Sequence, residues 1–330
     1  MNAILLFTSF AVILAGALLF TNAVEWIGHR LEIGEGAVGS LLAAVGTAMP
    51  ETLIAIVALV GATKSEDVAI GAIVGAPFLL GTLAMGLVGL FAYLYRRRRQ
   101  GGIELSAHVP TLDRDLVFFL AFFALALGLG LGAPEEVRIA AGILFFASYP
   151  IYVWRTLIRG GETQDEETLN PLYMERRSRR STNPSLVIAV IQFLIGLGAM
   201  VGGAHLFVEE LLHVAEDIGV EAIVLSLILA PLATELPEKV NSFFWVREEK
   251  DSLALGNITG AMVFQSTIPV GIGLAFTDWD LSGNAAISMI LGLAGGGLAY
   301  WTLRLRGRFE LPSVIAWLAL YAAFIVVVAV

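Results

Sequence analysis

Long runs of apolar residues, interrupted by only a few polar positions, follow one another along almost the whole chain. Runs of about 20 or more mostly apolar residues are typical of helices that cross a bilayer. The pattern predicts ten spans, at residues 3–27, 36–62, 67–95, 113–132, 135–157, 184–213, 220–246, 252–277, 283–303 and 311–329. We therefore expect an all-α polytopic membrane protein with ten transmembrane helices.

The composition supports a membrane protein. Hydrophobic residues make up 57% of the chain and charged residues 15%, whereas a soluble domain carries about 25% charged residues. The chain contains no cysteine, so a disulfide framework and a thiolate metal site are both excluded. The partner that this composition predicts is the lipid bilayer rather than a nucleic acid.

Basic residues gather after the odd-numbered spans. They are Arg96 to Arg99, Arg155, Arg159, Arg176, Arg177, Arg179, Arg180, Arg247, Lys250, Arg304, Arg306 and Arg308. Because loops rich in lysine and arginine stay in the cytoplasm, both termini are expected outside the cell membrane and segment 158–183 inside.

The first half of the chain is echoed in the second. The motif GTAMPE (46–51) has a counterpart in ATELPE (233–238), and AIGAIVGAPFLLGT (69–82) aligns without gaps with ALGNITGAMVFQST (254–267). We expect two five-helix repeats, 1–157 and 184–330, joined by the cytoplasmic linker 158–183. Five is an odd number of spans, so the second repeat is inverted relative to the first, an architecture of secondary transporters.

Each of the two repeat motifs places a proline inside an apolar span. Proline has no N–H and clashes with the carbonyl four residues back, so Pro50 should free the carbonyl of Gly46 and Pro237 that of Ala233. Freed carbonyls at membrane depth are tolerated where they line a cavity or are buried in protein. We therefore expect interrupted helices that offer backbone oxygen ligands.

Each proline is followed directly by a glutamate. Thr47 and Glu51 lie four residues apart and share a helix face, as do Thr234 and Glu238. Each repeat thus offers a hydroxyl, a carboxylate and a freed carbonyl, and Ca²⁺ takes about 6–8 oxygen ligands. We expect the two sets to bind one divalent cation, which would offset the cost of two carboxylates in hydrocarbon.

Two amide side chains, Asn257 and Gln265, stand in the otherwise uncharged eighth span. An amide in this span either reaches the cation site or forms a hydrogen bond between helices. The sequence leaves both roles open.

These motifs resemble the two α-repeats of the cation/calcium exchanger superfamily, which usually read G-T-S-L-P-E and G-N-x-x-G-S-N. The resemblance covers the whole chain. It implies a sodium/calcium exchanger-like fold in which Glu51 and Glu238 are the paired calcium ligands and Thr47 and Thr234 contribute to the ion sites. It also implies that the first and sixth spans slide across the rest to alternate access.

The chain diverges from the family pattern in the second half of each α-repeat. The altered positions are Ala48, Glu235, Ala76, Ala261, Pro77, Met262, Leu80 and Gln265. Most of the lost groups are those that the family uses for sodium. Glu235 either adds a third carboxylate, which would suit a proton as counter-ion, or pairs with Lys239 four residues on.

We therefore expect a monomeric secondary antiporter, not an enzyme, that exchanges Ca²⁺ or a related divalent cation for Na⁺ or H⁺ and needs no cofactor. The expected cation ligands are Glu51, Glu238, Thr47, Thr234, Glu235, Gly46, Ala233, Gln265 and Asn257. The alternatives are a cation channel and a repurposed exchanger fold with altered ion specificity.

Overall fold

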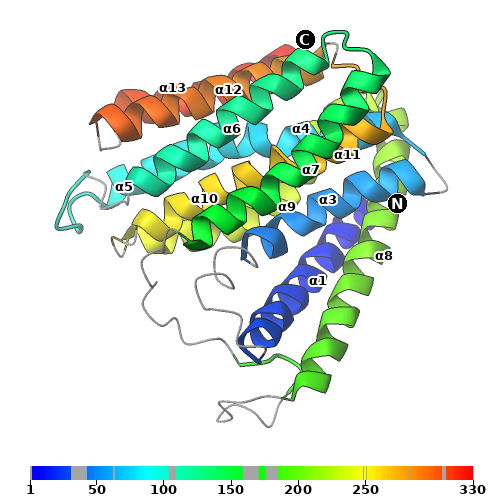
Figure 1. The fold of residues 1–330 in the computed structure, drawn as a ribbon, viewed down its shortest axis with the longest axis horizontal. Coiled ribbons are helices and arrows are strands. Elements are labelled where there is room, and N and C mark those ends of the chain that lie inside the picture. The colour runs from blue at the N-terminus through cyan, green and yellow to red at the C-terminus, as the bar shows by residue number, and fades with distance from the viewer. Residues whose placement is uncertain are drawn as a thin grey trace.

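A computed structural model describes residues 2–30, 43–61, 64–103, 109–158, 171–175, 185–247, 249, 251–281, 283–306 and 310–329. Within these ranges the chain is helical and contains no strand (Figure 1). The helices of the first half are α1 (Asn2–Arg30), α3 (Ala43–Val60), α4 (Glu66–Leu79), the π-helical turn η2 (Leu80–Ala84), α5 (Met85–Tyr95), α6 (Val109–Leu129) and α7 (Glu135–Ile158). Those of the second half are α8 (Leu186–Ile218), α9 (Ala222–Arg247), α10 (Asp251–Gln265), α11 (Ile268–Phe276), α12 (Asn284–Trp301), the π-helical turn η4 (Thr302–Arg306) and α13 (Leu311–Ala329).

Each predicted span overlaps one helix or a run of consecutive helices. Seven helical segments among the described residues are long and apolar enough to cross a membrane, and α3 and α9 contain shorter apolar stretches, 48–60 and 222–232. The multi-pass membrane character is therefore confirmed, whereas the count of ten spans and the inversion of the repeats stay predictions.

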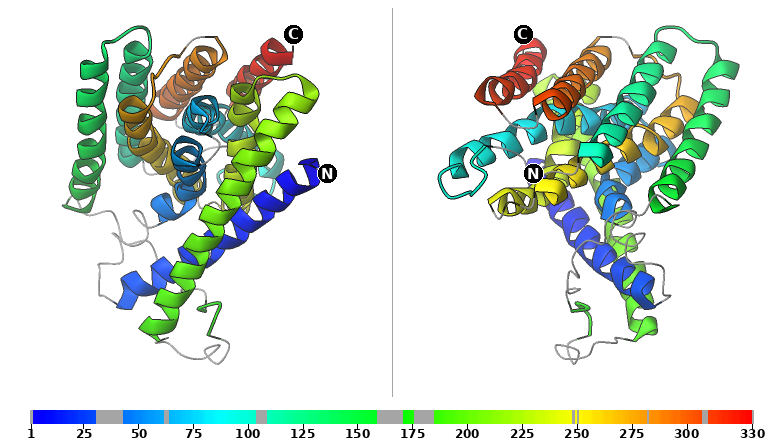
Figure 2. Two further views of the ribbon diagram at one scale, coloured as in Figure 1. Left: turned by 90° about the vertical axis from the view of Figure 1, so that its right-hand side faces the viewer. Right: turned by 60° about the vertical axis from the view of Figure 1, so that its left-hand side comes forward.

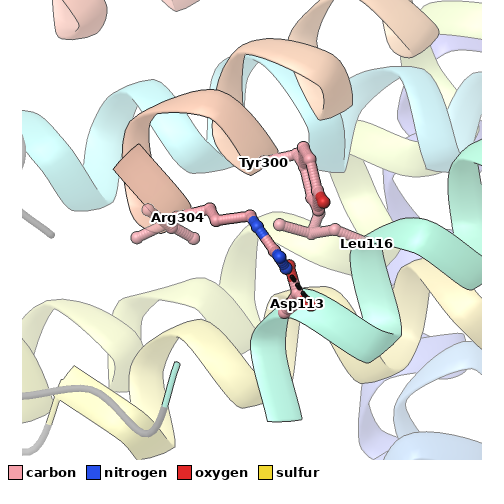
Figure 3. A pocket seen from close by; sticks show the side chains of 5 residues that line it. Asp113, Leu116, Tyr300 and Arg304 are labelled. Carbon is pink, nitrogen blue, oxygen red and sulfur yellow. Dashed lines mark hydrogen bonds and ion pairs between the residues drawn. The ribbon is translucent and has the colours of Figure 1, made fainter. Parts of the chain in front are cut away.

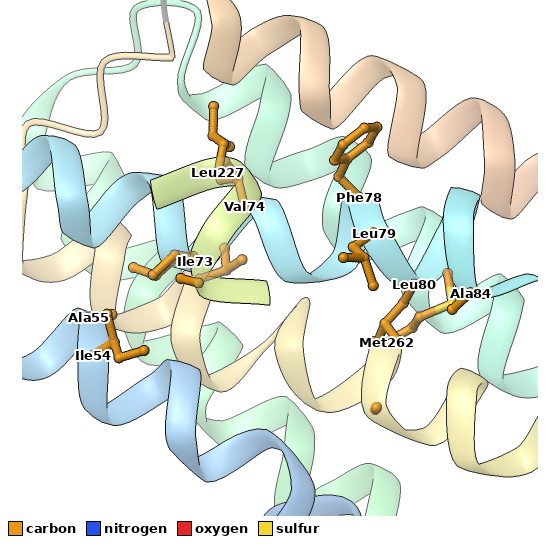
Figure 4. Packing of buried hydrophobic residues seen from close by; sticks show 14 of the residues in the cluster. Ile54, Ala55, Ile73, Val74, Phe78, Leu79, Leu80, Ala84, Leu227 and Met262 are labelled. Carbon is orange, nitrogen blue, oxygen red and sulfur yellow. The ribbon is translucent and has the colours of Figure 1, made fainter. Parts of the chain in front are cut away.

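The central helix of the bundle is α4, whose residues from Val68 to Leu79 are all buried. It packs against α9, α3, α12, α10 and α11. Apolar side chains of α3, α4, α9 and α10 fill the space around it, among them Ile54, Ile73, Leu227 and Met262 (Figure 4). Small residues let the backbones of α4 and α9 come close: a Cβ on Gly75 would lie 2.6 Å from the carbonyl oxygen of Leu227.

The helices α1 and α8 form a crossed pair that extends from one side of the bundle (Figure 2). Their backbones touch, because a Cβ on Gly196 would lie 2.7 Å from the amide nitrogen of Phe20 and 2.8 Å from the carbonyl oxygen of Gly16. Only glycine fits at such a contact. The short segment 171–175 of the predicted linker lies against this pair, with Leu172 buried beside Trp26.

The expectation that Pro50 and Pro237 interrupt their helices is wrong. Both α3 and α9 run through these prolines as single helices, since neighbouring hydrogen bonds can hold a membrane helix together around one missing N–H. Among the spans that carry the repeat motifs, the irregular segments lie in the third and eighth instead. The turn η2 contains Thr82, and the break between α10 and α11 contains Thr267, its repeat-aligned counterpart.

Candidate functional site

Three helices bring polar side chains together in the middle of this apolar bundle. Glu51 is the only charged residue of α3, and its side chain is 2% exposed. Glu235 of α9 and Gln265 of α10 are fully buried. These three residues form what we call the carboxylate–amide site.

One amide group bridges the two carboxylates of this site. The Nε2 of Gln265 donates a hydrogen bond of 2.6 Å to Oε1 of Glu51 and a second, short hydrogen bond to Oε1 of Glu235. The Oε1 of Gln265 is buried and has no hydrogen-bond partner among the described residues. Gln265 therefore forms hydrogen bonds from α10 to both α3 and α9, and its role as a cation ligand stays a prediction.

The backbone beside Gln265 also departs from a regular helix. Its carbonyl would normally accept from the N–H of residue 269, and Pro269 has none. The helix stops at Gln265 and restarts at Ile268 with Pro269 in its first turn, a position that proline favours. The carbonyl of Gln265 therefore lacks the N–H donor that a continuous helix would supply from residue 269.

Two other predicted ligands, Thr234 and Asn257, do not join the hydrogen bonds of the carboxylate–amide site. The hydroxyl of Thr234 is buried next to Glu235 but donates to the carbonyl of Ala230 at 2.9 Å in its own helix. Asn257 is half-buried and lies eight residues before Gln265 on α10, about 12 Å along the helix axis. The structure does not bring Asn257 to the carboxylate–amide site.

For the remaining predicted ligands the structure describes only the backbone, which is helical, and not the side chains. These ligands are Gly46 and Thr47 in α3, and Ala233 and Glu238 in α9. The pairing of Glu51 with Glu238 therefore stays a prediction, as does that of Glu235 with Lys239. Among the described residues no three His, Cys, Asp or Glu side chains converge closely enough to hold a metal.

Positions at which the family carries polar groups are apolar here. Ala48, Ala76, Ala261 and Leu80 are all buried. The site therefore offers carboxylates and one amide rather than a shell of neutral hydroxyl and amide oxygens. This donor set can neutralise a cation, but it offers few additional neutral ligands.

Sequence reasoning missed three buried polar contacts. Asp115 of α6 binds side chains of α7 and α10, Arg99 binds Asp251, and Gln192 binds Asn22 at 2.9 Å. Asp115 had a signal that could have found it, because it is an acid inside the predicted fourth span.

Comparisons with known proteins identify the family. The family described as "Sodium/calcium exchanger protein" matches residues 1–158 and 188–330. The sodium/calcium exchanger MaX1 of Methanosarcina acetivorans is 24% identical over 295 residues, which cover 83% of each chain. In fold the chain is similar to an H⁺/Ca²⁺ exchanger, CAX, with a TM-score of 0.74, 20% identity and coverage of 98% of this chain and 81% of that one.

A second solved structure is similar in fold. The sodium-calcium exchanger NCX_Mj, soaked with Na⁺ and Sr²⁺, has a TM-score of 0.61 and 21% identity, with 98% of each chain covered. Because the family matches both halves of the chain and nearly all of its length, this protein belongs to the sodium/calcium exchanger protein family.

Proposed function

We propose that the protein is a secondary antiporter that exchanges a divalent cation, Ca²⁺ in the first place, for a monovalent one across the membrane. The observation that carries the proposal is the bridging of Glu51 and Glu235, both buried, by the single amide of Gln265. The cation would bind between the two carboxylates, and the Gln265 amide would turn so that its carbonyl oxygen faces the ion.

The charges of this site support coupled exchange. Two carboxylates in the apolar centre of a membrane protein are costly unless positive charge accompanies them. One divalent ion neutralises both, and two monovalent ions do the same. Exchange of one divalent ion for two monovalent ions would keep the net charge of the site constant, which favours obligatory exchange over a leak.

The donor set favours protons as the counter-ion. Sodium would need neutral oxygens at positions that this chain fills with Ala48, Ala76, Ala261 and Leu80. A carboxylate, by contrast, takes up a proton without further ligands. Thr47 and Thr234 would complete the divalent site together with the carbonyls of Gly46, Ala233 and Gln265. Glu238 would add a third carboxylate, which suits a proton as counter-ion.

The two repeats pack differently, which supports alternating access. Gly71 and Gly75 of α4 are buried against α9, with Ser226 and Leu227 as neighbours. Their repeat-aligned counterparts Gly256 and Gly260 on α10 are partly exposed and meet no described atom within 4 Å of an added Cβ. With the orientation predicted from the basic residues, the partly exposed face lies on the cytoplasmic side, so the structure would represent an inward-facing state.

Reaction of single cysteines tests this state, because the chain has no cysteine of its own. Asn257→Cys should react with a membrane-impermeant thiol reagent applied from the cytoplasmic side. The control is Ala72→Cys, the repeat-aligned position, which is fully buried and should not react from either side. Equal protection of both cysteines would contradict an inward-facing state.

Calcium flux into proteoliposomes tests the function itself. A proton gradient and a sodium gradient are applied separately, and calcium uptake is measured with the unmodified protein and with Glu51→Gln. We expect proton-driven uptake that Glu51→Gln abolishes and that Glu66→Gln, an exposed control at the start of α4, preserves. Uptake without any counter-gradient would indicate a channel, and no uptake under any gradient would indicate a repurposed fold.

A further inference from the structure

Asp115 of α6 is a buried carboxylate that belongs to neither repeat motif. Its side chain is 3% exposed, and it lies inside the predicted fourth span. An acidic side chain at such a position is costly and is expected to have specific partners.

Donors from three helices surround this carboxylate. The hydroxyl of Thr259 on α10 donates to Oδ2 of Asp115 at 2.9 Å. The hydroxyl of Tyr152 on α7 donates to Oδ1, and Nη2 of Arg114 lies 3.3 Å from the same oxygen. Asp115 therefore ties α6, α7 and α10 together at one point.

The same stretch of α10 leads to the carboxylate–amide site. Gln265 lies six residues after Thr259, about 9 Å further along the helix axis. Its neighbour Phe264 packs edge-on against Tyr149 of α7, with ring centroids 5.1 Å apart. Tyr149 lies one turn before Tyr152, so α7 contacts α10 directly beside Gln265 and is joined to it through Asp115 one turn further along.

The helix that carries Glu51, α3, also packs against the contact between Tyr149 and Phe264 beside Gln265. Ala48 of α3, three residues before Glu51, is buried in one cluster with Tyr149, Val263 and Phe264. A shift or rotation of α10 at Thr259 would therefore change the position of Gln265 relative to Glu51.

A second acid on α6 provides a matched control. Asp113 forms an ion pair with Arg304 of η4 at 2.5 Å, next to Tyr300, and both side chains are partly exposed (Figure 3). This pair connects α6 to η4 rather than to α10. Arg114, Arg304, Tyr152 and Tyr300 are the other ionisable groups that the described elements place around these two acids.

We propose that Asp115 is a positioning residue of the exchanger: it holds α10, through Thr259, at the height and rotation that place Gln265 between Glu51 and Glu235. The inference rests on the proposed function. Asp115 acts through α10, so its loss should weaken binding of the divalent cation more than it slows the maximal exchange rate.

The test uses Thr259→Val and Tyr152→Phe, which each remove one hydroxyl donor and keep the shape of the side chain nearly unchanged. Loss of a hydrogen bond to a charged group should raise the KM for calcium about tenfold, with little change in the maximal rate. Thr259→Ser keeps the hydroxyl and should restore the KM. Asp113→Asn removes an acid from the same helix and should leave the KM unchanged.

A double-mutant cycle with Gln265→Ala separates positioning from a general loss of stability. If Asp115 acts through Gln265, Thr259→Val should raise the KM only while Gln265 is present. An unchanged KM in both Thr259→Val and Tyr152→Phe, or fully additive effects in the cycle, would overturn the inference. Absence of exchange by the unmodified protein would instead overturn the proposed function.

Discussion

Arg99 and Asp251 form a buried ion pair that links the end of the third span to the start of α10. Two parallel hydrogen bonds join them, at 2.7 Å and 2.6 Å, and both side chains are fully buried. Arg99 also donates to the carbonyls of Val246 and Gly102. Asp251→Asn keeps the size of the side chain but removes the charge that compensates the guanidinium.

The expected loss of stability in Asp251→Asn follows from this geometry. Removing one partner of a buried ion pair destabilises a protein by about 3–5 kcal/mol, because the other charge stays buried without compensation. Replacing both partners by apolar residues, as in Arg99→Met with Asp251→Leu, removes that charge as well. The double variant should therefore recover most of the loss.

The melting temperatures of the variants, measured in detergent, report this loss and recovery of stability. Tryptophan fluorescence is the signal, because the chain has no cysteine for a thiol-reactive dye to label. The control is Asp113→Asn, which breaks the partly exposed pair with Arg304. Because solvent screens a partly exposed pair, the melting temperature of Asp113→Asn should match that of the unmodified protein. The reasoning would be refuted if Asp251→Asn also melted at the unmodified temperature, or if the double variant were less stable than the single one.

Two further predictions concern the α1–α8 pair. Gly196→Val should prevent the close approach of α8 to Gly16 and lower the melting temperature, because its Cβ would meet the α1 backbone. The control is Gly198→Val, which should not change the melting temperature, because no described atom lies close to a Cβ at this position. Gln192→Leu removes the amide that accepts from the Met174 backbone at 2.8 Å, so protease should cleave segment 171–175 faster; unchanged cleavage would show that other contacts hold the segment.

The membrane character and the positions of the helices could be predicted from the sequence, because apolar runs of spanning length leave few alternatives. The repeat motifs predict the interruption of the helices at the wrong prolines. Pro50 stands well inside its helix, and α3 continues through it. Pro269, which lies outside the repeat motif 254–267, stands where a helix can restart and marks the real break.

The candidate site could be predicted only in part. The repeat placed Glu51, Glu235 and Gln265 in the right helices, since buried acids and amides stand out in apolar spans. Which of them meet depends on how α3, α9 and α10 pack, and helix periodicity does not determine packing between helices. The bridge from Gln265 to both Glu51 and Glu235 therefore required the structure, as did the hydrogen bonds that Asp115 of α6 accepts from α7 and α10.

Calcium binding by the purified protein tests the central claim most directly. Isothermal titration is performed with the unmodified protein, Glu51→Gln, Glu235→Gln and the exposed control Glu66→Gln. If the two buried acids hold one cation together, the unmodified protein and Glu66→Gln should bind one Ca²⁺ with the same affinity, and Glu51→Gln and Glu235→Gln should each lose that binding. Undiminished calcium affinity in both Glu51→Gln and Glu235→Gln would contradict the account.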